Sequence, residues 1–164
     1  MQAKILLADD DLSIISYLEP MLKRALFHVV VAQDGEQALA LTESEAPDLI
    51  ILDIKMPKLD GWEVCRQLRK RERYIPIIML TSVFTEVIDE VIGLKIGADH
   101  YFPKDTDPHI LIAQIEATLR IVYASRATSH SNLLTCADLK IDLDKRKVWM
   151  AGRKIDLTPK EFQL

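Results

Sequence analysis

Several features that mark other protein classes are missing from these 164 residues. No apolar run approaches the ~20 residues of a membrane-spanning helix, so we expect no membrane partner. The N-terminal stretch MQAKILL carries one lysine and soon meets aspartates, a pattern that argues against a signal peptide. Only two cysteines, Cys65 and Cys136, are present. Without a secretory signal, this count indicates reduced thiols and a cytoplasmic location.

Positive charge is scarce in the first three quarters of the chain. Residues 1–125 carry 13 Lys and Arg against 20 Asp and Glu, a net charge of −7, which argues against a nucleic-acid surface there. Residues 126–164 carry 8 basic and 5 acidic residues, a net charge of +3, which permits contact with DNA. The length suffices for one well-cored domain and a fragment of a second.

Short apolar runs alternate with amphipathic stretches through the first 125 residues. The runs are rich in β-branched residues and apolar on both faces, which is typical of buried parallel strands. Their repeated alternation with helical patterns predicts a doubly wound α/β domain with a five-stranded parallel sheet. The expected strands are 4–8, 28–32, 48–53, 76–81 and 99–103, and the expected helices are 11–26, 35–45, 60–72, 85–96 and 107–125.

The pattern changes after the last of these helices. SRATSHSN, residues 125–132, is small and polar, which predicts a linker. Apolar and polar residues then alternate with a period of two, and Ala151-Gly152 is a turn signal, so we expect a short antiparallel meander. The chain closes with LTPKEFQL, in which Thr158 as N-cap and the proline after it predict the start of a helix.

Acidic residues gather where two of the expected strands end. Asp9 and Asp10 follow the first strand, and Asp53 ends the third. In the flavodoxin-like strand order 2-1-3-4-5 these strands are neighbours that flank the switch point, so the three carboxylates would converge. Like charges this close repel, and a hard divalent cation such as Mg²⁺ would neutralise them. Asp11 would point away and cap the helix that follows.

A single aspartate at a strand end is more often a solvated loop residue than a ligand. Two further residues favour a binding site here, because Thr81 ends the fourth expected strand and Lys104 follows the fifth. A hydroxyl, a cation and three carboxylates on neighbouring strand ends can hold a metal ion together with a phosphoryl group.

Taken together, these motifs resemble those of a response-regulator receiver domain. The resemblance rests on DDD at 9–11, ILDIKMPKLDGWEVC, IIMLTS and GADHYFPK, and it covers residues 4–123. The meander and LTPKEFQL are similar to the opening of the winged-helix effector domain of the OmpR/PhoB subfamily. The resemblance implies a receiver domain at 1–124, a linker at 125–132, and the first part of a winged-helix domain at 133–164.

The resemblance also implies roles for the acidic residues. Asp53 would be the phosphoacceptor, taking a phosphoryl group from a phosphohistidine on a sensor histidine kinase. Asp10, supported by Asp9, would hold Mg²⁺ together with Asp53 and the backbone carbonyl of Lys55. Such chemistry depends mainly on positioning and on charge neutralisation.

Three further residues would bind or sense the phosphoryl group. Thr81 would hydrogen-bond one of its oxygens, and Lys104 would pair with another. Tyr101 would be the aromatic switch that swings inward when Thr81 moves; the alternative is a half-buried strand tyrosine with its hydroxyl in water. Lys104 is followed by Asp105, whereas receivers commonly have proline there after a cis bond. Because cis bonds without proline cost ~3 kcal/mol, we expect a trans peptide after Lys104.

A second departure affects the face on which this subfamily usually dimerises, formed by the fourth and fifth helices and the fifth strand. Several of the usual ion pairs are altered, and only reversed or partial pairs remain. We therefore expect weak or no self-association of the unphosphorylated receiver, because exposed ion pairs contribute only ~0–1 kcal/mol each. The residues of this possible dimer face are Ile92, Lys95, Asp99, Ile110, Glu116 and Arg120.

Two other functions compete with a phosphorylation-controlled regulator. A haloacid-dehalogenase-type phosphatase also uses a strand-end aspartate, but it needs a second Asp two residues later, where this chain has Lys55. A phosphorylation-independent interaction module would keep the fold without the switch, and the intact acidic pocket argues against it. We expect that this chain is not an enzyme. The helix that reads DNA would follow LTPKEFQL, so we expect promoter binding by a longer protein and not by this chain.

Overall fold

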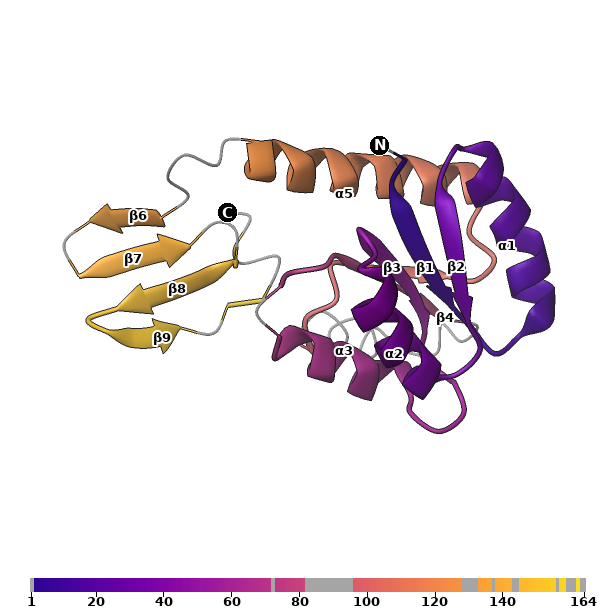
Figure 1. The fold of residues 1–164 in the computed structure, drawn as a ribbon, viewed down its shortest axis with the longest axis horizontal. Helices are drawn as coiled ribbons and strands as arrows, with labels where there is room; N and C mark the ends of the chain where they lie inside the picture. Colours follow the sequence, from indigo (N-terminus) through magenta and orange to yellow (C-terminus); the bar gives the residue numbers. More distant parts are fainter. Residues whose placement is uncertain are drawn as a thin grey trace.

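The computed structural model describes most of the chain. The described residues are 2–71, 73–81, 96–127, 133–136, 138–142, 145–155, 157–158 and 162. Two sheets are present among them, a larger one near the N-terminus and a smaller one near the C-terminus (Figure 1). No helix in the described ranges is long and apolar enough to span a membrane.

The larger sheet is parallel and has the order β2-β1-β3-β4-β5, which confirms the predicted flavodoxin-like topology. Its strands are nearly all apolar because helices cover both faces. Each observed strand lies within one residue of its predicted bounds. The strands are β1 (Lys4–Ala8), β2 (His28–Ala32), β3 (Leu49–Asp53), β4 (Ile77–Thr81) and β5 (His100–Pro103).

Four helices pack on this sheet in the described part of the chain. Aspartate side chains cap three of them: Asp11 accepts from the Ser13 amide, Asp34 from Gln37 and Asp60 from Glu63. The predicted cap at Asp11 is thus confirmed. The helices are α1 (Leu12–Arg24), α2 (Gly35–Glu45), α3 (Gly61–Arg69) and α5 (Pro108–Ala127).

Several boundaries of the predicted helices differ from the structure or lie beyond it. The helices α1 and α3 end at Arg24 and Arg69, two and three residues before their predicted ends, and Leu26 after α1 has a positive φ that a helix does not allow. The helix α5 continues to Ala127, two residues past its predicted end, because Arg126 and Ala127 are good helix formers with no breaker before them. The predicted helix at 85–96 falls almost wholly on residues 82–95, which lie outside the described residues.

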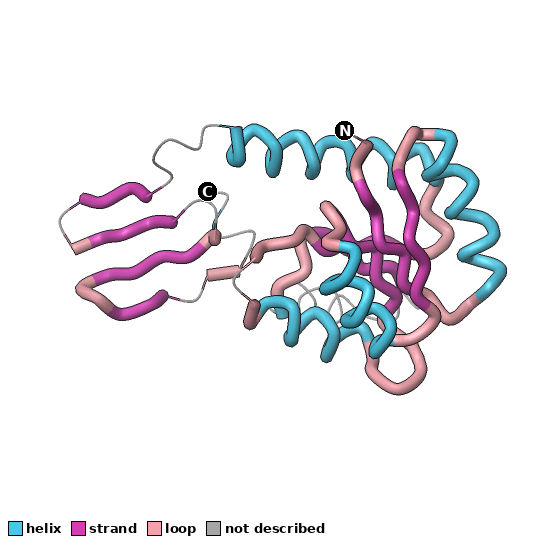
Figure 2. Tube along the Cα trace, in the orientation of Figure 1, coloured by secondary structure: helices cyan, strands magenta, loops and turns pink. Residues whose placement is uncertain are grey.

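Helices lie on both faces of the larger sheet (Figure 2), and the core forms one layer of side chains on each face. Alternate residues of each strand point to opposite faces, so Ile5 and Leu7 pack on one side and Leu6 on the other. The first side is covered by α1 and α5, through Leu18 and Ile115 among others. The other side is covered by α2 and α3. The carboxyl ends of the strands carry the candidate site.

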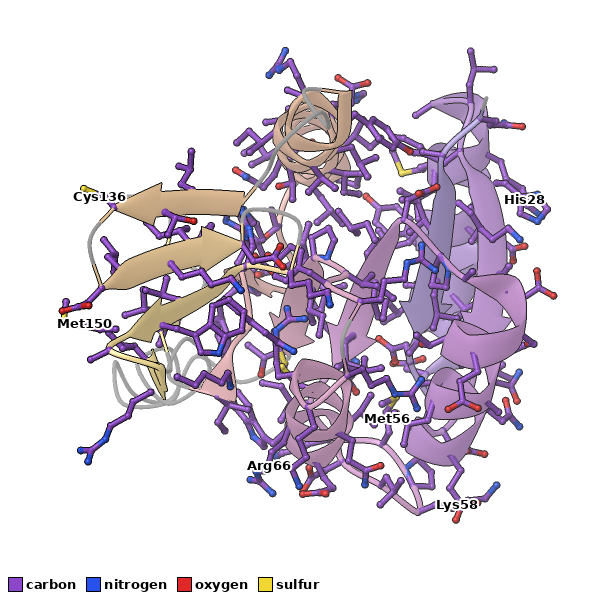
Figure 3. All side chains as sticks on the ribbon, turned by 60° about the vertical axis from the view of Figure 1, so that its left-hand side comes forward. His28, Met56, Lys58, Arg66, Cys136 and Met150 are labelled. Carbon is purple, nitrogen blue, oxygen red and sulfur yellow. The ribbon has the colours of Figure 1, made fainter. Side chains whose placement is uncertain are left out.

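The smaller sheet is the predicted antiparallel meander, with order β6-β7-β8-β9. It comprises β6 (Leu133–Cys136), β7 (Leu139–Asp142), β8 (Lys147–Met150) and β9 (Arg153–Ile155). Ala151 and Gly152, both at positive φ, make the predicted turn between β8 and β9. Cys136 and Met150 mark the end of the meander far from the larger sheet (Figure 3).

One backbone hydrogen bond links the described residues that follow the meander. The Phe162 amide donates to the Thr158 carbonyl at 3.1 Å, which agrees with a helix beginning at Thr158. The proline after Thr158 lies outside the described residues.

Candidate functional site

The carboxyl ends of four parallel strands bring the predicted residues to one edge of the larger sheet. Asp9 and Asp10 follow β1, and Asp53 is the last residue of β3. Thr81 is the last residue of β4, and Lys104 follows β5. Parallel strands end at the same edge, so residues far apart in the sequence become neighbours. Asp9, Asp53 and Thr81 are all buried, with exposed fractions of 6% or less.

Lys104 joins two of these carboxylates. Its ammonium nitrogen lies 3.1 Å from Oδ2 of Asp53 and donates a hydrogen bond to Oδ1 of Asp9 at 3.0 Å. Oδ2 of Asp9 is also only 2.8 Å from this nitrogen, but it has no hydrogen bond, so that contact is purely electrostatic. Oδ1 of Asp9 also accepts the Asp11 amide at 2.9 Å.

The charges of this cluster do not balance, because one ammonium group faces two buried carboxylates. Burial, which outweighs the hydrogen bond from Lys104, raises the pKa of Asp9 above its usual range. Burial, and after it the neighbouring charge of Asp9, likewise raises the pKa of Asp53. Burial opposes the charge of Lys104, but the two carboxylates outweigh it and raise that pKa. One cation therefore serves two buried carboxylates and leaves them short of positive charge.

The same three carboxylates fit a divalent cation. Asp9, Asp10 and Asp53 each offer an oxygen within 4.8 Å of the other two. All are hard oxygen donors of the kind that Mg²⁺ prefers, and Asp10 is exposed, which leaves the site open to water. The Oδ2 atom of Asp9, which accepts no hydrogen bond, can also serve as a ligand of the cation. The residues present thus fit Mg²⁺, and Lys55 lies exposed in the loop that follows Asp53.

The β4–β5 edge of the site departs from the pattern of receivers as the sequence indicated. Pro103 pairs with Thr81 at the end of the sheet, and the Lys104 amide donates to the Thr81 carbonyl at 2.7 Å. The described residues contain no cis peptide bond, so the predicted trans peptide after Lys104 is confirmed. Asp105 is exposed, whereas the side chain of Lys104 is only 11% exposed and reaches into the pocket.

Sequence reasoning missed the role of Gly61, the first residue of α3. Its amide donates to the Ile54 carbonyl at 2.8 Å, so the loop after Asp53 folds back on the strand end. A Cβ at this position would overlap the backbone carbonyl oxygen of Asp53. Only glycine allows the backbone to approach so closely. The Asp60-Gly61 pair in the loop was the available signal, but it indicates only a turn.

Trp62 is a second residue that the sequence analysis did not single out. Its ring stacks on that of Tyr101, with centroids 6.3 Å apart and planes 18° apart. Tyr101 lies on β5 opposite Met79, and its hydroxyl is buried. The predicted aromatic switch residue is therefore packed against the first turn of α3, beside the loop that leads from Asp53.

The residues of the possible dimer face are not all on the surface. Ile110 is 57% exposed, and Glu116 and Arg120 are exposed on α5. Ile92 and Lys95 lie outside the described residues. Asp99 is the exception: it is 4% exposed and pairs with Arg69 of its own chain at 2.9 Å. The carboxylate of Asp99 is thus paired within its own chain in this structure, and the dimer face itself stays a prediction.

Comparison with known proteins agrees with this geometry. The response regulator receiver domain family matches residues 5–116. The alkaline phosphatase synthesis transcriptional regulatory protein PhoP of Bacillus subtilis is 42% identical over 170 residues, which cover 100% of this chain and 70% of that protein. The probable transcriptional regulator ycf27 of Cyanophora paradoxa is 44% identical over 164 residues, covering 98% and 68%.

Solved structures extend the likeness to both sheets. The response regulator DrrB of Thermotoga maritima, an OmpR/PhoB homologue, has a TM-score of 0.65 and 31% identity, and the match covers 99% of this chain and 70% of that one. The receiver domain of the Francisella response regulator 1452 has a TM-score of 0.70 and 31% identity, covering 73% and 98%. The chain spans about 70% of these longer relatives. It belongs to the response regulators of the OmpR/PhoB type and contains their receiver domain.

Proposed function

We propose that this chain is a receiver that Asp53 phosphorylation switches on, with a sensor histidine kinase as donor. The observation that carries the proposal is the charge imbalance around Asp53. Two buried carboxylates share Lys104 at 2.8–3.1 Å, and both have raised pKa values. A structural ion pair would need no second buried acid, whereas a site for a cation and a phosphoryl group does.

In the reaction, an Oδ atom of Asp53 forms a bond to phosphorus while the bond from phosphorus to the donor's imidazole nitrogen breaks. The electron pair of that bond returns to the imidazole. Asp53 is the last residue of β3 and only 4% exposed, so its carboxylate is held in place by the strand and shielded from water. Positioning of this kind provides much of the catalysis in phosphoryl transfer.

Asp9, Asp10 and Asp53, with the Lys55 carbonyl, would hold Mg²⁺. When bound, the ion supplies positive charge that offsets the negative charge of the phosphoryl oxygens. Lys104 already reaches Asp53 at 3.1 Å, so a small movement of its flexible side chain would bring it to a phosphoryl oxygen on that residue. The Thr81 hydroxyl, at the end of the neighbouring strand, would donate to another oxygen.

The conformational change at the phosphorylation site would then be transmitted to the effector domain. Movement of Thr81 toward the phosphoryl group would open space for Tyr101, which now stacks on Trp62. We propose residues 1–124 as the receiver, 125–132 as the linker and 133–164 as the start of a winged-helix domain. Binding to promoter DNA would belong to a longer protein that carries the recognition helix.

Mass spectrometry of the intact chain tests the proposal. Incubation with Mg²⁺ and acetyl phosphate or phosphoramidate should add about 80 Da, the mass of one phosphoryl group, and the adduct should last for minutes. Asp53→Asn should remove it. Asp60→Asn is the matched control, because Asp60 is an exposed helix cap in the same loop and should leave phosphorylation unchanged.

The alternatives predict different results in the same experiment. Rapid turnover of many organic phosphates without an adduct would indicate a phosphatase of the haloacid-dehalogenase type. No adduct and no turnover would indicate an interaction module that works without phosphorylation. Uptake by Asp53→Asn at the wild-type rate, with the label elsewhere, would overturn the assignment of Asp53.

A further inference from the structure

A notch in the receiver lies at the end of the sheet opposite to Asp53. Its floor is the buried carboxylate of Asp99, which directly precedes β5 and accepts hydrogen bonds from the Ile77 amide at 2.8 Å and from Arg69 at 2.9 Å. The Tyr74 hydroxyl donates to the other oxygen of Asp99. Asp99 is 4% exposed, so this notch is a fixed acidic and aromatic receptacle.

One side chain of the smaller sheet enters the notch. Arg146, in the turn between β7 and β8, places its guanidinium 4.2 Å from the centroid of the Tyr74 ring. Its Nη1 donates to the Tyr74 hydroxyl and lies 3.4 Å from Asp99. Only 14% of the Arg146 side chain is exposed. Stacking and charge pairing together are the way in which arginine is recognised most specifically.

Most charged side chains around this contact are cations, although Arg66 and Arg71 pair with Glu63 and Glu43 of the receiver. A cavity of about 630 Å³ separates α3 from the smaller sheet, and nine of its seventeen lining residues are Lys or Arg. Among the described residues none of the lining is acidic. Cations stand on both sides, and the main ones are Arg66, Lys70 and Arg73 of the receiver and Lys145, Lys147 and Lys154 of the meander.

This arrangement makes the contact both specific and releasable. Like charges across an open cavity oppose close packing of the two surfaces. Arg146 donates to the carboxylate of Asp99, which lies within this mainly cationic surrounding. An interface that depends on one charge-paired side chain can be broken by a small change at its receptacle.

The receptacle is mechanically close to the phosphorylation site. The Asp99 amide donates to the Ile77 carbonyl, so Asp99 ties the start of β5 to the start of β4. The other ends of these strands carry Thr81 and Lys104. At about 3.3 Å per residue, only about 13 Å of strand separates the two ends. Tyr101 lies between them on β5.

We propose that Arg146 and the Tyr74–Asp99 notch form a releasable clasp between the receiver and the smaller sheet, and that phosphorylation weakens it. The partner that this surface fits is the β7–β8 turn of the same chain. The second half of the statement rests on the proposed function. Coupling is reciprocal, so loss of the clasp should favour phosphorylation by the same factor by which phosphorylation loosens the clasp.

The clasp itself is tested on the unphosphorylated 164-residue chain. Arg146→Ala should raise the radius of gyration in small-angle scattering and speed hydrogen exchange of the Tyr74 segment. Arg153→Ala, which removes an equal charge from an exposed position at the start of β9, should change neither. Tyr74→Phe keeps the ring and should release the clasp partly. If Arg146→Ala matches wild type and Arg153→Ala in both measurements, there is no clasp.

The coupling is tested with Mg²⁺ and acetyl phosphate. Phosphorylated wild type should scatter like Arg146→Ala, and Arg146→Ala should be phosphorylated to a given extent at a roughly 5-fold or more lower donor concentration. A phosphorylated chain that keeps the scattering of the free form would overturn the coupling. If wild type takes up no phosphoryl group, the proposed function fails, and the scattering of the unphosphorylated variants still decides the clasp.

Discussion

The ammonium nitrogen of Lys104 lies 3.1 Å from Oδ2 of Asp53, although the two residues belong to different strand ends of the sheet. The same nitrogen binds Asp9. The charges of Lys104, Asp9 and Asp53 therefore depend on each other. Removal of any one should change the pKa values of the other two and the free energy of unfolding of the chain.

Lys104→Ala should destabilise the chain when no metal is present. Breaking a buried ion pair leaves uncompensated charge, so we expect the free energy of unfolding to fall by about 3 kcal/mol at pH 7. Mg²⁺ should restore part of this loss, since it supplies the missing positive charge. Urea unfolding with and without Mg²⁺ measures both effects. Lys23→Ala breaks an exposed pair with Glu19 and should cost only ~0–1 kcal/mol, with no response to Mg²⁺.

Mg²⁺ should stabilise the wild-type chain, and Asp10→Asn should remove this effect. A ligand at one hundred times its Kd adds about 2.7 kcal/mol to the free energy of unfolding. Asp10 is exposed and outside the Lys104 ion pairs, so its replacement should leave the metal-free stability nearly unchanged. Asp11→Ser keeps the helix cap and should keep the Mg²⁺ effect. Equal stabilisation of Asp10→Asn and wild type would exclude Asp10 as a ligand.

Gly61→Ala should impair both folding and phosphorylation. The added methyl group overlaps the Asp53 carbonyl, so the phosphoacceptor must shift, and overpacking of this kind costs about 1–3 kcal/mol. The uptake of a phosphoryl group from acetyl phosphate, measured by mass spectrometry, should become slower because of this displacement. Gly152→Ala is the control: its Cβ meets nothing within 4 Å, and positive φ alone should cost about 1 kcal/mol without slowing uptake. Normal uptake by Gly61→Ala would contradict the close approach.

The two cysteines should differ in reactivity. Burial raises the pKa of the Cys65 thiol from 9.0 to about 11, whereas Cys136 is exposed. At pH 8 a thiol reagent should therefore modify one thiol of the native chain and both after denaturation. Cys136→Ser should leave no reactive thiol in the native chain. Modification of both thiols at similar rates without denaturant would show that Cys65 is accessible.

The raised pKa of the Cys65 thiol also predicts a loss of stability at alkaline pH. Between pH 9 and 11 the unfolded chain releases the Cys65 proton while the folded chain retains it. The contribution of Cys65 is thus complete below pH 9 and falls by about 1.4 kcal/mol per pH unit as pH rises toward 11. The difference in free energy of unfolding between wild type and Cys65→Ala, measured from pH 8 to 10.5, isolates this slope. A difference independent of pH would contradict it.

The unphosphorylated chain should associate weakly or not at all through α5. Asp99 is engaged with Arg69 inside the chain, and exposed pairs such as those of Glu116 and Arg120 contribute only ~0–1 kcal/mol each. Exposed Ile110 would have to supply much of any affinity. Sedimentation at several concentrations measures it, with Ile110→Glu as the variant. A tight dimer that survives Ile110→Glu would exclude this surface.

The sequence by itself determined the larger sheet and the composition of its site. Runs such as residues 48–53 are apolar on both faces, and only a strand buried between two layers of helices explains that pattern. Chain order and the rule for switch points then brought Asp9, Asp53 and Lys104 together without coordinates. Local capping at Asp11 and Asp34 was likewise readable, because a cap bonds to amides two or three residues away.

Only the tertiary structure decided those contacts that no periodic pattern in the sequence indicates. Gly61 matters through a carbonyl eight residues earlier, and Trp62 through a ring on another strand. Asp99 shows the reason most plainly. Its charge suggested a surface pair with a second chain, but folding buried it among Arg69, Tyr74 and Arg146. Hydrophobic patterning fixes which face of an element is buried, whereas the partner of a buried charge depends on how separate elements meet in space.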